Sequence, residues 1–390
     1  MPFVVSTQQD TQLWLTDGVS DGGTQRLATF SNGQTALSPQ RFVSTSDYLF
    51  FVATAPNISA AAGGNPVLWR SAGTANGTIA LPASVETGYR AYSDITMTAV
   101  QNRLYFTAIT PEAGSELWTS DGSAAGTLLL KDFYPGAEAS TARVISHLGS
   151  TAFVVANSPE GTALWATEGT PESTRKIKQL SPQADYDGDV VYTVHDGKLF
   201  FGAPTGTAAS RTDNGFSEQD FGLWVTDGTA AGTQSLNVPI SIYGSDFASL
   251  DDQLFFGGQG PNGYELWRSD GTAEGTQQVL DLTPGTATYV FDCPAPAPQV
   301  PDCPSPIEFP NSSGVRSFNV QGNFLYFMAR DGNLFRTDGT GRGIQLVGQF
   351  NGTEVNGIQF SPDLIRVGEK LVVRGYSSDR RRMELWGLPE

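Results

Sequence analysis

The chain has 390 residues and a formal net charge of −17, from 40 acidic and 23 basic side chains. A charge of this sign and size argues against nucleic acid or an anionic membrane surface as a partner. No apolar run reaches the length needed to cross a bilayer, and the first residues lack the basic start and apolar stretch of a signal peptide. Neither nucleic-acid binding nor membrane insertion is therefore expected.

Eight copies of one short motif follow one another along the chain. Each has a leucine followed by an aromatic residue, and most continue into a Ser/Thr-Asp-Gly turn and a Gly-Thr pair. In chain order the aromatic residues are Trp14, Trp69, Trp118, Trp165, Trp224, Trp267, Phe335 and Trp386. Their mean spacing of about 53 residues is near the length of a four-stranded propeller blade.

Each copy predicts four short strands, named A to D in chain order. In the third copy, strand A is expected at 95–100, strand B at the aromatic segment 104–106, strand C at Leu117-Trp118 and strand D at 128–133. Adjacent leucine and tryptophan side chains on strand C point to opposite faces, which suits a sheet buried between two neighbours. We expect each indole N–H to reach a carbonyl oxygen.

A sharp turn is expected after strand C. Asp-Gly pairs stand there at 17–18, 121–122, 227–228, 270–271 and 338–339. The aspartate accepts hydrogen bonds from following backbone N–H groups, and the glycine takes the positive φ that the turn demands. Glu168-Gly169 and Ala72-Gly73 depart from this pattern, so the aspartate is not needed in every copy.

The two end copies are partial. The first predicts strands B, C and D, and the last predicts A at 363–367, B at 371–374 and C at 384–387. The sequence therefore predicts an all-β fold, a β-propeller of eight four-stranded antiparallel blades that forms one domain over residues 1–390. The alternative is seven blades with the partial copies merged, which would leave a second strand C without a place.

The best copies, Glu116-Leu117-Trp118 with Asp121-Gly122 and Glu265-Leu266-Trp267 with Asp270-Gly271-Thr272, resemble the bacterial ELWxxDGT-repeat proteins, sometimes called hyalin-like. The resemblance covers nearly the whole chain. It implies a β-propeller of an exported or cell-surface protein, and it brings no catalytic residues with it.

Connection lengths point to one face of the blades. The A–B and C–D turns are short, whereas long B–C loops are expected at 56–66 and 204–221, and long D–A loops at 84–94 and 282–314. B–C and D–A connections emerge at the same end of a blade, here called the loop face, where propellers commonly bind partners. The binding candidates on it are Tyr89, Arg90, Tyr92, Tyr134, Arg211, Asp213, Asn214, Phe216 and Tyr264. The alternative is ordinary solvated loops with a few anchoring aromatic residues.

The segment Asp185-Tyr186-Asp187-Gly188-Asp189 is the metal candidate. The alternating carboxylates Asp185, Asp187 and Asp189 resemble the start of a calcium loop, but the later ligands of such a loop are missing. A solvated acidic turn is the competing interpretation. No cofactor other than calcium is indicated.

The only two cysteines, Cys293 and Cys303, flank a proline-rich stretch within an insertion at 283–314. A local disulfide is the simplest interpretation, and two free buried thiols are the alternative. High Gly and Thr with few lysines suits an extracellular or cell-surface protein, with the periplasm as the alternative location.

Catalytic motifs are not evident. The two histidines, His147 and His195, fall at A–B turns, opposite the loop face, and are expected to be turn residues. The sequence favours a non-enzymatic binding, adhesion or scaffold module whose partner is a protein or a glycan at the cell surface. The alternative is a carbohydrate-active protein, a lectin or a glycoside hydrolase, because many carboxylates are available for an acid pair.

Overall fold

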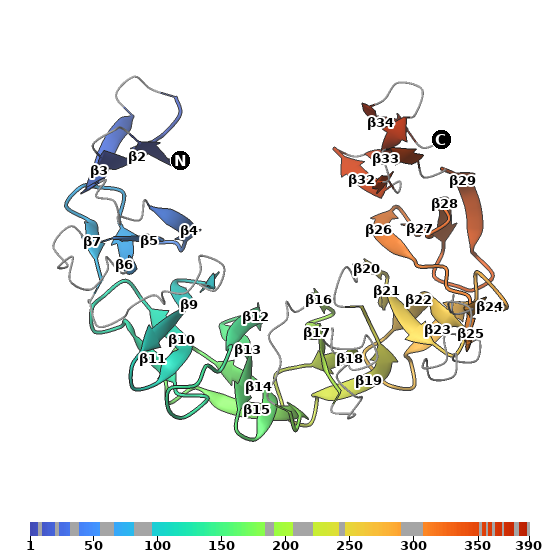
Figure 1. Cartoon of the computed structure of the whole chain (residues 1–390), viewed down its shortest axis with the longest axis horizontal. Coiled ribbons are helices and arrows are strands. Elements are labelled where there is room, and N and C mark those ends of the chain that lie inside the picture. The colour runs from blue at the N-terminus through green and yellow to red at the C-terminus, as the bar shows by residue number, and fades with distance from the viewer. Residues whose placement is uncertain are drawn as a thin grey trace, which may run out of the picture. The chain divides into compact units, whose positions relative to one another are not determined.

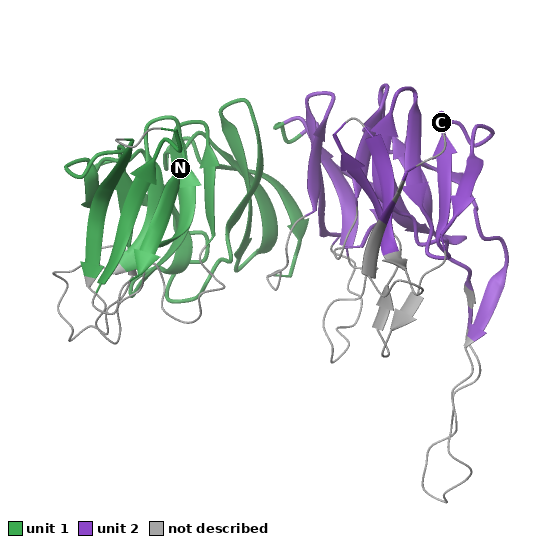
Figure 2. Cartoon of the chain, turned by 90° about the horizontal axis from the view of Figure 1, so that it is seen from above, with its two compact units in different colours: residues 1–187, 228–230 green, residues 188–227, 231–390 purple. Residues whose placement is uncertain are grey.

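The computed structural model describes residues 1–6, 10–19, 23–31, 39–54, 66–81, 96–183, 191–205, 221–241, 246–289, 307–350, 353–355, 358–360, 363–368, 370–377 and 382–387. Every regular element in these ranges is a β-strand (Figure 1). Accordingly, no helix in this part of the chain is long and apolar enough to span a membrane. The described residues form two compact units, Met1–Asp187 with Gly228–Ala230, and Gly188–Asp227 with Ala231–Glu390 (Figure 2).

The first unit holds four antiparallel sheets that follow one another in chain order. They are made of β1 (Pro2–Ser6), β2 (Asp10–Thr16) and β3 (Thr24–Ser31); β4 (Gln40–Ser44), β5 (Leu49–Thr54), β6 (Pro66–Ser71) and β7 (Thr78–Ala80); β8 (Met97–Val100), β9 (Arg103–Thr110), β10 (Gly114–Ser120) and β11 (Leu128–Lys131); and β12 (Arg143–Leu148), β13 (Thr151–Ser158), β14 (Gly161–Thr167) and β15 (Arg175–Ser181).

The second unit holds the next four sheets and two small hairpins. The sheets are β16 (Tyr192–His195), β17 (Lys198–Pro204), β18 (Phe221–Thr226) and β19 (Gln234–Pro239); β20 (Phe247–Leu250), β21 (Gln253–Gly260), β22 (Gly263–Ser269) and β23 (Gln277–Leu280); β26 (Arg316–Gln321), β27 (Phe324–Met328), β28 (Asn333–Thr337) and β29 (Gln345–Gln349); and β32 (Asp363–Val367), β33 (Lys370–Ser377) and β34 (Arg382–Gly387). The hairpins pair β24 (Thr286–Tyr289) with β25 (Ile307–Pro310), and β30 (Thr353–Val355) with β31 (Ile358–Phe360).

The predicted fold class is confirmed: the protein is all-β and is built of four-stranded antiparallel blades of the propeller type. The six sheets between the two ends each run A-B-C-D in chain order. The end sheets have three strands each, B-C-D in the first and A-B-C in the last. With these two, the described residues form eight sheets that correspond to the eight copies of the motif.

Leucine and tryptophan on strand C lie on opposite faces of the sheet, as predicted. Leu117 of the third sheet packs in one core with Trp165 of the fourth. Leu68 of the second sheet packs likewise with Trp118 of the third. These two cores each join the leucine face of one sheet to the tryptophan face of the next.

The expected hydrogen bond of each indole N–H is found in only part of the described residues. Trp69 Nε1 donates to the carbonyl oxygen of Ala53 at 3.2 Å. Buried indole nitrogens without a protein acceptor occur at Trp118, Trp165, Trp224 and Trp267. The expectation was wrong there, and the repeated tryptophan contributes through buried apolar area more than through its polar atom.

The turn chemistry after strand C is confirmed. Asp270 Oδ1 accepts bonds from the N–H and the hydroxyl of Thr272, at 2.8 and 2.7 Å, and these bonds lower the pKa of the Asp270 carboxyl. Gly271 follows with φ +87°. Beneath the turn, Ser269 and Thr276 share a hydroxyl hydrogen bond of 2.7 Å, which ties strand C to strand D.

Strand D of the third sheet ends earlier than expected. It was predicted to reach residue 133, but β11 stops at Lys131. Beyond that point the backbone N–H groups of Phe133 and Tyr134 donate to the side chain of Glu116 rather than to a neighbouring strand. The chain leaves the sheet there because a side chain replaces its backbone acceptor.

Candidate functional site

B–C turns and D–A connections meet at one end of each blade, as predicted for the loop face. A Cβ added at Gly114, in the B–C turn of the third sheet, would lie 2.1 Å from the carbonyl oxygen of Glu138 in the D–A connection. Added at Gly263, it would lie 2.0 Å from the carbonyl oxygen of Asn311. Only glycine permits this approach, so at these two glycines the chain packs directly against the backbone of the D–A connection.

A buried glutamate anchors the D–A connection of the third sheet. Glu116 is fully buried, and its carboxylate accepts bonds from the N–H groups of Phe133 at 3.2 Å and Tyr134 at 3.1 Å. Burial raises the pKa of Glu116 to about 7, against the opposing effect of hydrogen bonds from Ser140, Tyr134 and Phe133. The side chain thus holds the start and the end of one connection together.

Glu265 does the same for the connection that contains the insertion. Its carboxylate accepts bonds from the N–H of Leu282 at 3.1 Å, the hydroxyl of Thr283 at 3.0 Å and the N–H of Ser313 at 2.9 Å. One carboxylate therefore fixes both ends of the long segment at 283–314. This role is not among those predicted from the sequence, although its signal is visible there: the glutamate directly precedes the Leu-Trp pair.

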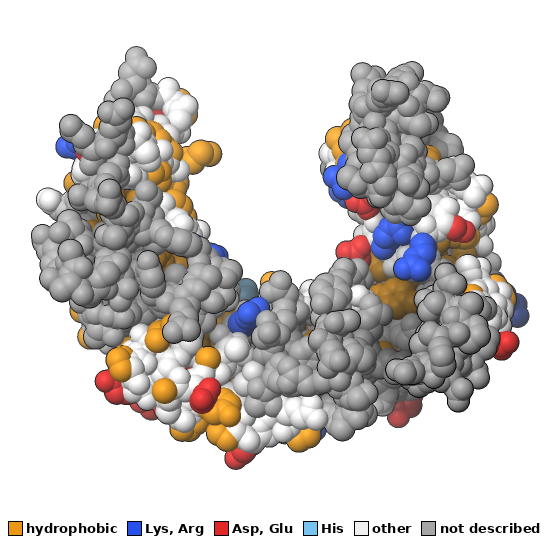
Figure 3. Space-filling view, viewed as in Figure 1, with side chains coloured by type: hydrophobic (Ala, Val, Ile, Leu, Met, Phe, Trp, Pro, Cys, Tyr) orange, Lys and Arg blue, Asp and Glu red, His pale blue; other side chains and the backbone are white. Residues whose placement is uncertain are grey.

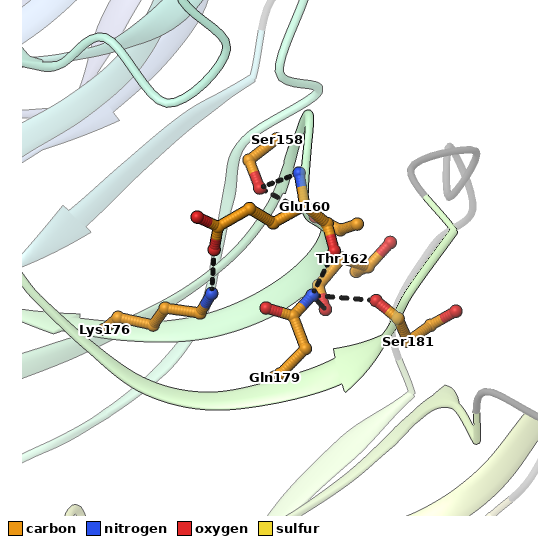
Figure 4. A network of polar contacts seen from close by, with 7 residues as sticks. Ser158, Glu160, Thr162, Lys176, Gln179 and Ser181 are labelled. Carbon is orange, nitrogen blue, oxygen red and sulfur yellow. Dashed lines mark hydrogen bonds and ion pairs between the residues drawn. The ribbon is translucent and has the colours of Figure 1, made fainter.

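The fourth sheet carries a polar network at the same end (Figure 4). The side-chain nitrogen of Gln179 on β15 donates to the carbonyl oxygens of Glu160, Thr162 and Ser181, at 3.1, 3.0 and 2.8 Å. Lys176 pairs with the exposed Glu160 at 2.8 Å. The B–C turn between β13 and β14 is thereby fastened to strand D, so its surface side chains sit on a fixed backbone.

Two of the predicted binding residues lie in described parts of the loop face. Tyr134 is half-buried beside the Glu116 anchor. The ring of Tyr264 lies over Gly257, where an added Cβ would come within 2.6 Å of it, and it packs on the core between the sixth and seventh sheets. Tyr264 is therefore an anchoring aromatic residue rather than an open contact residue.

The other candidates lie outside the described residues. These are Tyr89, Arg90, Tyr92, Arg211, Asp213, Asn214 and Phe216, the calcium candidates Asp185, Asp187 and Asp189, and the two cysteines Cys293 and Cys303. Among the residues the structure does describe, no cluster of three or more metal-binding side chains is present.

A polar row forms at the loop face of the second unit, where β20, β26 and β32 begin, and it is not among the sites predicted from the sequence. Ser317 on β26 has φ +60°. Its N–H donates to Asp246 Oδ2, just before β20, at 2.6 Å, and its hydroxyl donates to Asp363 Oδ1, the first residue of β32. Each of the three residues stands eight positions before the first leucine of strand B, and this register was the available signal.

Arginines surround this row. Arg374 on β33 pairs with Asp363 Oδ2 at 3.0 Å. Arg316, next to Ser317, is half-buried and donates to the carbonyl oxygen of Ala329 at 3.4 Å. Arg330 is exposed in the adjoining B–C turn. Figure 3 shows basic side chains with acidic ones beside them over β26 and β27, so the face carries both signs of charge.

The two histidines lie at A–B turns, where the sequence placed them. His147 Nδ1 is 3.1 Å from the carbonyl oxygen of Gly149. His195 is 8 % exposed, and its Nδ1 lies 2.9 Å from the hydroxyl oxygen of Ser249 on the next sheet. Both contacts are at the opposite end of the blades from the loop face.

Comparison with known proteins yields structural likeness alone. No protein-family model matches the chain, and no curated protein matches it. Among solved structures, the designed protein Ika8 is 12 % identical with a TM-score of 0.39, covering 99 % of this chain and 95 % of its own. BamB from Moraxella catarrhalis is 10 % identical with a TM-score of 0.36, covering 99 % and 96 %. The β-propeller domain of the Trilobed protease from Pyrococcus furiosus is 13 % identical with a TM-score of 0.32, covering 90 % and 94 %. At these scores the matches carry no argument about function.

Proposed function

We propose that this protein is a non-enzymatic binding or scaffold module that engages a protein or a glycan through the loop face of its blades. The observation that carries the proposal is the anchoring of that face. Glu116 and Glu265 fix the ends of two D–A connections, and tight glycine turns hold the B–C side. Long loops on a rigid base are the arrangement that binding surfaces on repeat folds use.

An exported or cell-surface location is part of the proposal. It is supported by the resemblance to ELWxxDGT-repeat proteins and by an acidic, lysine-poor composition. A net charge of −17 keeps such a module apart from nucleic acids and anionic lipid, and leaves proteins and glycans as partners.

The test shortens the two long B–C loops. Residues 57–64 and 207–219 would each be replaced by the two-residue turn Pro261-Asn262 that joins β21 and β22. We expect this variant to lose binding in a glycan array and in capture from native cell-surface extracts. The control is Glu172→Ser with Glu274→Ser, which removes two exposed charges at C–D turns on the opposite end. Equal losses in both variants, or no loss in either, would contradict loop-face binding.

Calcium is tested in the same assay. If Asp185, Asp187 and Asp189 hold the ion, binding should fall with chelator and in Asp187→Ala. Unchanged binding under both conditions, with no calcium heat in titration calorimetry, would eliminate the metal.

A glycoside hydrolase is the second candidate, and one observation favours it. Asp246, just before β20, and Asp363, on β32, both accept hydrogen bonds from Ser317, so two carboxylates lie close together on the loop face. Paired carboxylates at short range are the catalytic unit of most glycosidases. Turnover of a glycan that is abolished in both Asp246→Asn and Asp363→Asn would replace the binding-module proposal with this one.

A further inference from the structure

The D–A connections of the third and sixth sheets begin and end in the same way. Gly136 and Gly285 follow strand D in the two connections, with φ of +109° and +108°. At the other end, the carbonyl oxygen that packs on the B–C glycine belongs to Glu138 in the third sheet and to Asn311 in the sixth. Between these two points the third sheet has a single residue, and the sixth has residues 286–310. We call residues 286–310 the arm.

The arm leaves the rest of its connection unchanged. Ser140 Oγ donates to the carbonyl oxygen of Ser115 at 3.5 Å, and Ser313 Oγ donates to that of Tyr264 at 3.2 Å in the corresponding place. Among the described strands, β24 and β25 of the arm pair only with each other. Figure 2 shows this hairpin reaching beyond the ends of the other purple strands. The arm is therefore an addition to a connection that is complete without it.

The backbone of β24 has an open edge. The N–H of Asn311 donates to the carbonyl oxygen of Gly285 at 3.0 Å, so these two residues form a hydrogen-bonded pair where the hairpin starts. Such pairs alternate along an antiparallel ladder, so Thr286 and Thr288 direct their N–H and carbonyl groups away from β25. Pro310, which lies opposite Thr286 and has no N–H, fits this alternation. No described strand lies along the outer edge of β24.

The two edges of the hairpin differ in their protection against a further strand. β25 contains the charged Glu308 and the proline Pro310, and both residue types discourage pairing at an edge. β24 has the sequence Thr-Ala-Thr-Tyr, which contains no charge and no proline and is rich in residues that favour strands. A two-stranded hairpin is marginally stable by itself, so a third strand would stabilise it. The edge of β24 is the one that can accept such a strand.

We propose that the outer edge of β24 binds an extended segment of a partner protein as a third strand. Thr286 and Thr288 supply the backbone donors and acceptors, and the side chains of both are exposed. Recognition by a row of backbone groups requires a polypeptide, because a glycan has no matching row of amides. The net charge of −17 favours a segment without acidic residues. The inference rests on the proposed role of the loop face, and it narrows the partner from a protein or a glycan to a protein.

The experiment selects binders of the whole chain from a phage-displayed library of random linear peptides. We expect enrichment of peptides that are rich in β-branched and aromatic residues and poor in acidic ones. A selected peptide, made synthetically, should slow hydrogen exchange at the backbone amides of Thr286 and Thr288. Absence of enrichment, or binding that leaves exchange at these two amides unchanged, would overturn the proposal.

Two matched proline variants assign the binding to one edge. Thr288→Pro removes an outward N–H of β24 and should weaken binding of the selected peptide at least tenfold. The pairing with β25 should persist, because the lost N–H takes no part in it. The control is Glu308→Pro, which removes the outward N–H directly opposite on β25 and should leave peptide binding unchanged. Equal losses in the two variants would contradict binding at β24.

A third variant does not depend on how the hairpin tolerates proline. Replacing the whole arm by one alanine gives the sixth sheet the connection of the third. We expect this variant to keep the thermal unfolding temperature of the wild type, since the connection is complete without the arm, and to bind no selected peptide. Retained peptide binding would place the site elsewhere and overturn the proposal.

A second copy of the chain is the competing occupant of this edge. Sedimentation velocity over a range of protein concentrations, without peptide, tests it. A dimer that Thr288→Pro abolishes and Glu308→Pro preserves would assign the edge to self-association and overturn binding of a partner. A monomer in all three proteins is the expected result.

The two proposals fail separately. Absence of peptide binding at β24, together with capture of a ligand that depends on the B–C loops, would overturn the β24 site and leave the binding module intact. Absence of both would overturn the loop-face function as well.

Discussion

At the scale of single residues, the buried carboxylate of Glu116 predicts a pH dependence of stability. Its pKa is about 7 in the folded protein against an ordinary value of 4.5. A raised folded pKa gives stability that is complete below pH 4.5 and is lost as the pH rises through 7. We expect the free energy of unfolding of the unit that contains Glu116 to fall by about 3 kcal/mol across this pH range because of this residue.

The measurement is thermal unfolding from pH 4 to 8 for the wild type and for Glu116→Gln. The glutamine does not titrate, so its profile should lack the decline that Glu116 contributes between pH 4.5 and 7. Parallel profiles for the two proteins would show that the carboxylate has no raised pKa.

Two turn glycines allow the stability cost of a steric clash to be measured separately from the cost of backbone strain. Gly122 has φ +86° and Gly149 has φ +59°. An added Cβ at Gly122 would lie 2.5 Å from the ring of Tyr48, whereas at Gly149 it would meet nothing within 4 Å. We expect Gly149→Ala to cost about 1 kcal/mol and Gly122→Ala about 3 kcal/mol by denaturant unfolding. Equal costs would mean that Tyr48 moves away freely.

At the scale of elements, the hairpin of β24 and β25 predicts how the two cysteines pair. Its last described pair is Tyr289 with Ile307. Cys293 follows Tyr289 by four residues and Cys303 precedes Ile307 by four, so continuation of this register would set the cysteines opposite each other. Directly opposed cross-strand positions have the Cα separation that a disulfide requires, about 5.5 Å.

We therefore expect one intramolecular disulfide in protein made under oxidising conditions. Peptide mapping without reductant should recover Cys293 linked to Cys303. The variant with both cysteines changed to serine should lose about 2–3 kcal/mol. Two alkylatable thiols in the oxidised, folded protein would contradict the pairing.

On strand C, the alternation of side chains was enough to predict which face each residue occupies. Leu117 and Trp118 were assigned to opposite faces from their adjacency, and the cores on either side confirm it. Strand D was less predictable, because its end at Lys131 depends on Glu116, which lies fifteen positions earlier in the chain. A strand boundary set by a distant side chain leaves no local signal in the strand itself.

At the scale of the whole molecule, the net charge predicts a response to salt. Forty acidic and 23 basic groups repel one another on balance, and ions screen this repulsion over about 10 Å at 0.1 M. We expect the thermal unfolding temperature at pH 7 to rise between 20 and 300 mM sodium chloride. A fall over this range would mean that ion pairs such as Arg374 with Asp363 outweigh the net repulsion.

The sequence by itself determined the repeat, the four strands of each copy, the two faces of strand C and the turn that follows it. Each of these depends on residues a few positions apart, whose alternation and turn chemistry act locally. The tertiary structure decided what meets at the loop face. Ser317 lies between Asp246 and Asp363, which are 71 and 46 residues away in the chain, and Glu265 reaches Ser313 across 48 residues. Such contacts form only when separate blades and connections pack together, and no local pattern records which side chains that packing brings within hydrogen-bonding distance.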